Sequence, residues 1–295
     1  MRKMMRHGLR WVSAFCLIVF AAVPAMGDVI YNNLTPNNSM AIATRPDTTA
    51  FEIEAGDDFF LKSRTSINGA SFIGLIVPGS AGAPSVSQVV VEMYRVFPLD
   101  SDAARIPKVP TRTNSPSDVA FDSRDSGANS LMFGTFVLAP TFTVLNTVQP
   151  GGIHASPLQT TGGNGPLTGQ EVQFNITFSN PFDLPPDHYF FVPQVDLTNG
   201  GQFYWLSASR PITGAGGTTP FPLGVTDLQA WTRDAQLDPD WLRVGMDIVG
   251  GTTPPTFNTA FSLAGTAIPA PASLTLLALG LAGLAGTRWR SNRRP

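Results

Sequence analysis

Apolar and polar residues alternate along much of the middle of the chain. The clearest stretch is 170–179, in which Val172, Phe174, Ile176 and Phe178 alternate with polar residues. A period of two is typical of a strand with one buried and one solvated face. The pattern therefore predicts a strand over 170–179.

Ten further short stretches combine apolar, β-branched and aromatic residues in the same way. They cover 49–55, 57–62, 66–77, 87–97, 131–138, 141–148, 188–197, 202–208, 241–249 and 257–265. The segments between them are rich in Gly, Pro, Asn and Ser, and 28 Gly with 26 Pro are too many for a helical protein. No long amphipathic helical period occurs between 28 and 267. Many short strands separated by turns predict an all-β fold, an antiparallel, jelly-roll-like β-sandwich over 28–266.

The loop region around 149–168 leaves two domain arrangements open. It could divide the strands into two small domains, or it could be a long loop within one sandwich. We expect a single sandwich, because all-β sandwiches of this length often form one domain.

The N-terminus has the three parts of a secretory signal peptide. Four basic residues within 1–10 precede the apolar stretch 11–25, which is short for a membrane span. Ala25 and Gly27 are small residues at the positions that signal peptidase reads, so we expect cleavage before Asp28. Cys16 lies inside the apolar stretch, so the mature chain has no cysteine. It must then be stabilised by a hydrophobic core or by bound ions, since disulfides are excluded.

The C-terminus contains a second apolar segment. Residues 273–287 carry no charge, and counting from Ala267 extends the segment to 21 residues, enough for a transmembrane helix. An arginine cluster follows, which would hold that end on the cytoplasmic side and leave the preceding domain outside. The cluster consists of Arg288, Arg290, Arg293 and Arg294.

A Pro-x-Pro step, an apolar helix rich in Leu, Gly and Ala, and a terminal Arg cluster, in that order, resemble the PEP-CTERM sorting signal of Gram-negative bacteria. The step here is Pro269-Ala270-Pro271, with Ala270 where that family usually has Glu. The resemblance implies recognition by exosortase, a membrane protease that cleaves near the motif and transfers the protein to the cell surface or extracellular polysaccharide. Two alternatives are a permanent C-terminal anchor and the last helix of a folded domain.

Charge is divided sharply along the chain. Residues 28–267 contain 11 of the 19 Lys and Arg but all 21 Asp and Glu, a formal net charge of −10. A surface of this sign repels phosphate backbones and disfavours nucleic-acid partners. It suits a soluble extracellular domain.

No motif for catalysis is present. The chain lacks a nucleophile elbow, a zinc-binding His-Glu-x-x-His, a phosphate-binding loop and a dinucleotide fingerprint. A Ser-His-Asp triad could be assembled only in space, from His188 with Asp183 or Asp187. We therefore expect no enzymatic activity.

Two carboxylate pairs are the closest match to a glycosidase. Asp57 and Asp58 are adjacent, so in a strand they would point to opposite faces and could not form one dyad. Asp238 and Asp240 flank a proline and are typical of a turn. A polysaccharide hydrolase therefore remains an alternative without identified residues.

Two further ligand hypotheses concern calcium and sugars. Structural calcium could bind the acidic loop with Asp122, Asp125 and Asn129, or the Asp57-Asp58 pair, although neither matches a calcium-loop spacing. Aromatic faces stack on sugar rings, so an exposed tryptophan would suit a lectin-like module, whereas a buried one would belong to the core. The candidates are Trp205, Trp231 and Trp241.

Together these features predict an exported bacterial surface or matrix protein with a structural or binding role and no resident cofactor. The expected partners are signal peptidase, exosortase and, for the lectin alternative, extracellular polysaccharide.

Overall fold

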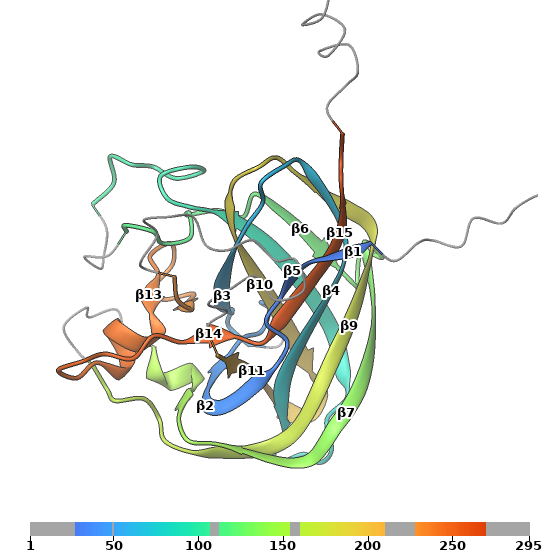
Figure 1. The fold of residues 1–295 in the computed structure, drawn as a ribbon. Coiled ribbons are helices and arrows are strands. Elements are labelled where there is room, and N and C mark those ends of the chain that lie inside the picture. The colour runs from blue at the N-terminus through green and yellow to red at the C-terminus, as the bar shows by residue number, and fades with distance from the viewer. Residues whose placement is uncertain (1–26, 49, 107–111, 154–159, 210–227, 270–295) are drawn as a thin grey trace, which may run out of the picture.

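Two β-sheets make up most of the part of the chain that is described. The computed structural model describes residues 27–48, 50–106, 112–153, 160–209 and 228–269. The sheets pack face to face and curl into a half-barrel (Figure 1). The all-β prediction is therefore confirmed.

The larger sheet has nine described strands. Its main path runs β1-β15-β4-β11-β2-β8, with β9 beside β4, β7 beyond β9, and β14 beside β11. All pairs are antiparallel except β2 with β8. The strands are β1 (Asp28–Asn32), β2 (Pro36–Ala43), β4 (Thr65–Val77), β7 (Leu131–Val144), β8 (Thr147–Val148), β9 (Leu167–Leu184), β11 (Gln202–Ala208), β14 (Asn258–Thr259) and β15 (Phe261–Ala267).

The smaller sheet has six described strands in the order β13-β12-β3-β10-β5-β6. These are β3 (Ile53–Phe60), β5 (Val86–Arg95), β6 (Asp122–Asp125), β10 (His188–Leu197), β12 (Trp231–Asp234) and β13 (Leu242–Arg243). In the described part of the chain, short helical segments lie at strand ends: η1 (Pro150–Gly152), η2 (Thr198–Gly200) and the π-helical η4 (Val244–Val249).

One hydrophobic core fills the space between the sheets. At its centre Phe191 of β10 lies 5.1 Å from Phe261 and 5.9 Å from Trp205, centroid to centroid, and both partners belong to the other sheet. The core contains residues from Tyr31 to Leu263, on both sides of the 149–168 loop. Burying large aromatic rings in this way supplies stability that a chain without disulfides needs.

The predicted strands agree with the structure best where alternation is strongest. In β9 the side chains of Val172, Phe174, Ile176 and Phe178 are buried as predicted, and the strand extends beyond 170–179 at both ends. The stretches 188–197 and 202–208 coincide with β10 and β11. Strands β1, β2, β6 and β12 were not predicted.

The strand predicted over 241–249 is wrong for most of its length. Only Leu242–Arg243 is a strand, and a π-helical turn follows. The Asp247 carboxylate accepts hydrogen bonds from the Arg243 backbone N–H at 2.7 Å and from its Nε at 3.0 Å, which curls the chain back on itself. A Cβ at Gly245 would lie 1.8 Å from the Pro255 carbonyl oxygen, so this turn needs a glycine.

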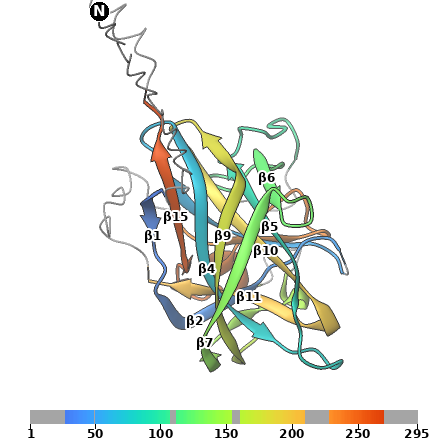
Figure 2. The same ribbon diagram turned by 90° about the vertical axis from the view of Figure 1, so that its right-hand side faces the viewer.

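The first and last strands are neighbours. β1 pairs antiparallel with β15, and Asp28 lies opposite Gly265. Figure 2 shows β1 and β15 side by side. The chain therefore enters and leaves the described fold at the same end.

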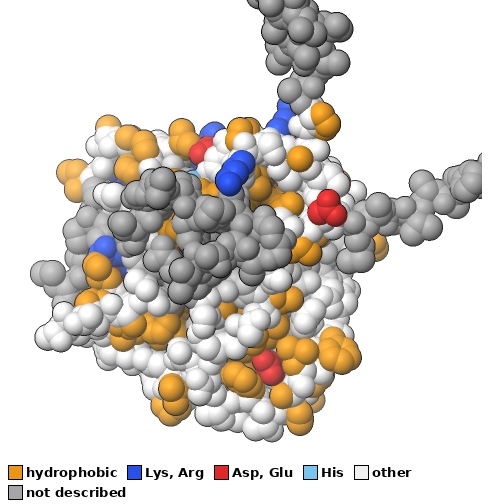
Figure 3. All heavy atoms as spheres, in the orientation of Figure 1, with side chains coloured by type: hydrophobic (Ala, Val, Ile, Leu, Met, Phe, Trp, Pro, Cys, Tyr) orange, Lys and Arg blue, Asp and Glu red, His pale blue; other side chains and the backbone are white. Residues whose placement is uncertain are grey.

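The face shown in Figure 3 carries few charged side chains, and its hydrophobic side chains are scattered among neutral ones. Several of the acidic residues that give residues 28–267 their negative charge are buried.

Candidate functional site: a buried carboxylate cluster

Strand alternation in β3 separates two sets of side chains. Asp57 faces the core, where its Oδ2 accepts hydrogen bonds from the Thr259 N–H at 2.7 Å and Oγ1 at 3.0 Å. Asp58 faces outward and contacts His188 Nε2 at 3.0 Å. Glu54 faces outward as well. The adjacent aspartates thus lie on opposite faces of the strand, as their spacing predicted.

Glu54 is the centre of a polar cluster on the outer face of the smaller sheet. Its side chain is only 3% exposed and accepts a hydrogen bond from Tyr94 Oη at 2.6 Å. Arg233 of β12 donates to both Glu54 oxygens, from Nε and, at 3.2 Å, from Nη2. Arg233 also donates to Tyr94 Oη at 3.0 Å. The buried carboxylate is therefore neutralised by a fork of the kind that guanidinium groups form.

Two more glutamates complete the cluster. Glu92 Oε2 accepts from Tyr94 Oη at 3.1 Å, and Glu52 Oε1 accepts from Gln194 Nε2 at 2.9 Å. One carboxylate oxygen from each of Glu52, Glu54 and Glu92 lies within 4.8 Å of the others. Burial, followed by the charges of Glu54 and Glu52, raises the pKa of Glu92 to about 8, and burial also raises the pKa of Glu52.

A small second core covers the cluster. It consists of Tyr94, Phe190, Val192, Trp231 and Trp241. The Arg233 guanidinium lies over the Trp241 ring at 4.5 Å, and Trp241 Nε1 donates to the Ser117 carbonyl at 3.1 Å. Glu54 is therefore covered by aromatic side chains, whereas Glu52 and Glu92 are only partly buried.

The geometry of the cluster bears on two kinds of chemistry, glycoside hydrolysis and cation binding. Carboxylates this close leave too little room for the water that an inverting glycosidase holds between them, although retaining glycosidases use carboxyl groups only about 5–5.5 Å apart. Carboxylate oxygens also suit hard cations, but Arg233 already supplies a positive charge to Glu54. The arrangement is best suited to joining β3, β5 and β12.

The catalytic hypotheses at His188 find little support in its surroundings. The imidazole contacts Asp58, not Asp183 or Asp187, and stacks on Phe60 at 4.0 Å. Burial lowers the pKa of His188 to about 4, so the ring is neutral at pH 7, with Nε2 in hydrogen-bond contact with Asp58 Oδ2. Asp183 instead forms an exposed ion pair with Arg64.

The three tryptophans proposed for sugar stacking are buried. Trp205 lies in the main core and donates from Nε1 to the Ala260 carbonyl at 3.0 Å. Trp231 and Trp241 belong to the second core. None of the three presents a free ring face, so the structure matches the core alternative and not the stacking platform.

The calcium candidates are engaged with other side chains. Both Asp122 oxygens accept from Arg124, and Asp125 Oδ1 accepts from Gln88 Nε2 at 2.8 Å and from the Gly127 N–H at 2.7 Å. Asn129 adopts a left-handed backbone conformation, with φ of 58°, in the same turn. These contacts are typical of a self-capped acidic turn.

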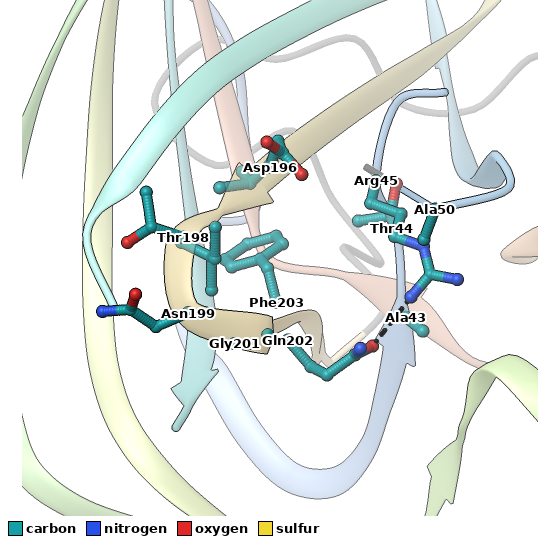
Figure 4. A pocket seen from close by; sticks show the side chains of 13 residues that line it. Ala43, Thr44, Arg45, Ala50, Asp196, Thr198, Asn199, Gly201, Gln202 and Phe203 are labelled. Carbon is teal, nitrogen blue, oxygen red and sulfur yellow. Dashed lines mark hydrogen bonds between the residues drawn. The ribbon is translucent and has the colours of Figure 1, made fainter. Parts of the chain in front are cut away.

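A separate pocket of about 240 Å³ lies at the turn between β10 and β11. Figure 4 shows Arg45 and Gln202 pointing toward each other, with Arg45 Nη1 donating to Gln202 Oε1 at 3.1 Å. Asp196 and Asn199 line other parts of the wall, and Phe203 lies between them. The pocket combines charged, amide and aromatic groups.

The sorting residues fall mostly outside the described residues. Gly27, Asp28 and Pro269 are described, whereas Ala25, Ala270, Pro271 and the four terminal arginines are not. Within the described ranges, no helix has the length and apolar character needed to cross a membrane.

Residues 267–294 match the PEP-CTERM protein-sorting motif. The chain carries a PEP-CTERM sorting signal. The PEP-CTERM motif begins at Ala267, the last residue of β15, so it follows the folded domain directly. Proteins with a PEP-CTERM signal are exported and recognised by exosortase. The match therefore confirms in outline the prediction that this protein is exported. No curated protein and no solved structure matched the chain.

The glutamate cluster was not predicted from the sequence. Glu52 and Glu54 are two residues apart, as are Glu92 and Tyr94, and this spacing places each pair on one face of its strand. This two-residue spacing was the only indication of the cluster in the sequence. The sequence spacing does not show that β3, β5 and β12 lie in one sheet, with β10 between β3 and β5.

Proposed function

We propose that this PEP-CTERM protein is delivered to the cell surface or extracellular matrix of a Gram-negative bacterium, where residues 28–266 serve a structural or binding role without catalysis. The observation that carries the proposal is the sorting motif, which begins where β15 ends. The pairing of the buried Glu54 carboxylate with Arg233 supports a role without catalysis. The proposal includes no resident cofactor, and Asp122 and Asp125 of the acidic turn are hydrogen-bonded to Arg124 and Gln88.

The sorting step is testable by mass spectrometry of the exported protein in a host with exosortase. We expect signal peptidase to leave Asp28 as the first residue and exosortase to remove the segment after about Pro271. Replacing the four terminal arginines by glutamine should leave that segment attached, because the topological signal is lost. Arg64→Gln, in an exposed ion pair, is the matched control and should be processed normally. An intact tail on the unmodified protein would instead indicate a permanent anchor.

Carbohydrate binding is the second candidate, and the pocket beside Arg45 and Gln202 favours it. Its volume and polar groups suit a single sugar unit. Glycan-array binding of the exported protein should then weaken about tenfold in Gln202→Leu, since a polar contact is lost. Gln173→Leu, on β9 of the larger sheet, should bind as before. An array without any bound glycan would exclude the lectin hypothesis.

A further inference from the structure

Strand β7 forms an open edge of the larger sheet. Among the described strands it pairs only with β9, through residues 131–144. Its opposite side therefore has no described strand partner, and the backbone groups on that side are available for pairing. Figure 2 shows β7 running along the front of the molecule.

Large apolar side chains are exposed on both faces of this edge, beside uncharged threonines. Met132 is 62% exposed and Phe136 is 64% exposed, and Val137 and Leu138 are exposed as well. Because Phe136, Val137 and Leu138 are consecutive, they project to both sides of the strand. Hydrophobic side chains are visible along the lower right margin of Figure 3, where Figure 1 places β7 and β9.

The edge also lacks the features that normally prevent strands from associating. Residues 131–144 contain no charged side chain, whereas β6, at an edge of the other sheet, is Asp-Ser-Arg-Asp. The edge strands β8 and β13 have two residues each, and β1 has five. Natural edges are usually short or charged, so β7 is the exception among the described edges. Pro140 has no N–H to donate, which limits useful pairing to 131–139.

We propose that β7 pairs edge to edge, antiparallel, with β7 of a second copy of this chain. Each copy then contributes the same strand to a two-fold interface. Antiparallel pairing of identical strands matches the hydrogen-bonding groups of the two copies. The rest of the ectodomain is strongly acidic, and two copies can approach through an uncharged strand without opposing like charges. Pairing joins the open backbone groups and covers Met132, Phe136, Val137 and Leu138. This inference concerns assembly and goes beyond the proposed sorting and binding roles.

The first test is sedimentation of the full chain expressed without exosortase, kept in a nonionic detergent so that the C-terminal apolar segment does not itself associate. We expect a concentration-dependent dimer. Phe136→Lys should raise the dimer dissociation constant about tenfold or more, because two lysines would face each other across the axis. Val119→Lys places the same charge on an exposed apolar residue away from β7 and should leave the dimer unchanged. A monomer at all concentrations, or a dimer that Phe136→Lys does not weaken, would overturn the proposal.

The second test keeps the edge nearly native, in case the lysine variant fails to fold. In a Cys16→Ser background the chain has no cysteine. Single cysteines from Gly134→Cys, Thr135→Cys and Phe136→Cys lie close to the expected two-fold axis, so at least one should form a disulfide-linked dimer under mild oxidation. Val119→Cys is the control and should remain monomeric. Cross-linking no stronger on β7 than at Val119 would contradict the proposed interface.

Discussion

Replacing Arg233 by methionine is expected to lower the free energy of unfolding by about 3–5 kcal/mol, measured by urea denaturation. The substitution leaves the Glu54 carboxylate buried with Tyr94 as its remaining donor in the cluster. It also removes the Nη2 hydrogen bond to Tyr94. Removing one partner of a buried ion pair costs more than the pair itself contributes, because a desolvated charge is left uncompensated.

Two further variants test whether the loss of stability comes from the buried charge of Glu54. Arg64→Met breaks an ion pair whose side chains are 60% and 45% exposed, and it should change the free energy of unfolding far less, because solvent screens the pair. Adding Glu54→Gln to Arg233→Met should restore part of the lost free energy of unfolding, because the buried, unpaired carboxylate charge of Glu54 is then absent. Equal losses from Arg233→Met and Arg64→Met would show that the cluster does not hold the smaller sheet together.

The free energy of unfolding is expected to fall by about 1–1.5 kcal/mol between pH 6.5 and pH 8. The pKa of Glu92 is about 8 in the folded protein and 4.5 without the fold, so between these values only the folded state holds the proton. Stability is therefore lost as the pH rises through that window. His188 acts in the opposite direction, because its folded pKa of about 4 lies below its ordinary value of 6.5. Its contribution ends near pH 6.5, which leaves the effect of Glu92 unopposed above that point.

Glu92→Gln tests the assignment of this pH dependence. The amide cannot ionise, so the slope between pH 6.5 and pH 8 should largely disappear, while Glu171→Gln on β9 should retain it. The measurement is a series of urea denaturation curves at fixed ionic strength. A slope that persists in Glu92→Gln would assign the effect to other groups, such as the general repulsion within an acidic domain.

The sequence predicts those features that depend on local pattern or on the order of segments. Alternation located β9, β10 and β11, and the opposite orientations of Asp57 and Asp58 follow from the strand period alone. The sorting signal is a linear motif, so its parts could be recognised without any knowledge of the fold.

Features that depend on contacts between distant segments were missed. Arg233 reaches Glu54 across 179 positions of sequence, and no local pattern indicates that they meet. Trp231 and Trp241 are buried because loops and strands cover the outer face of the smaller sheet, which the alternation of a single strand cannot show. The turn at Val244–Val249 depends on Asp247 and on the close approach of Pro255 to Gly245, against an apolar pattern that favoured a strand.

The pairing of β15 has a mechanical consequence for a domain held by its C-terminal end. β15 is flanked by β4, from Phe261 opposite Phe72 to Ala267 opposite Thr65, and on its other side by β1. Hydrogen bonds between antiparallel strands lie perpendicular to the strands, so a pull directed out of the Ala267 end loads both ladders in shear. Bonds loaded in shear must break together, whereas bonds that are peeled break one at a time. In the proposed C-terminal attachment, a pull would enter the domain through β15, a strand that resists being drawn out of the sheet.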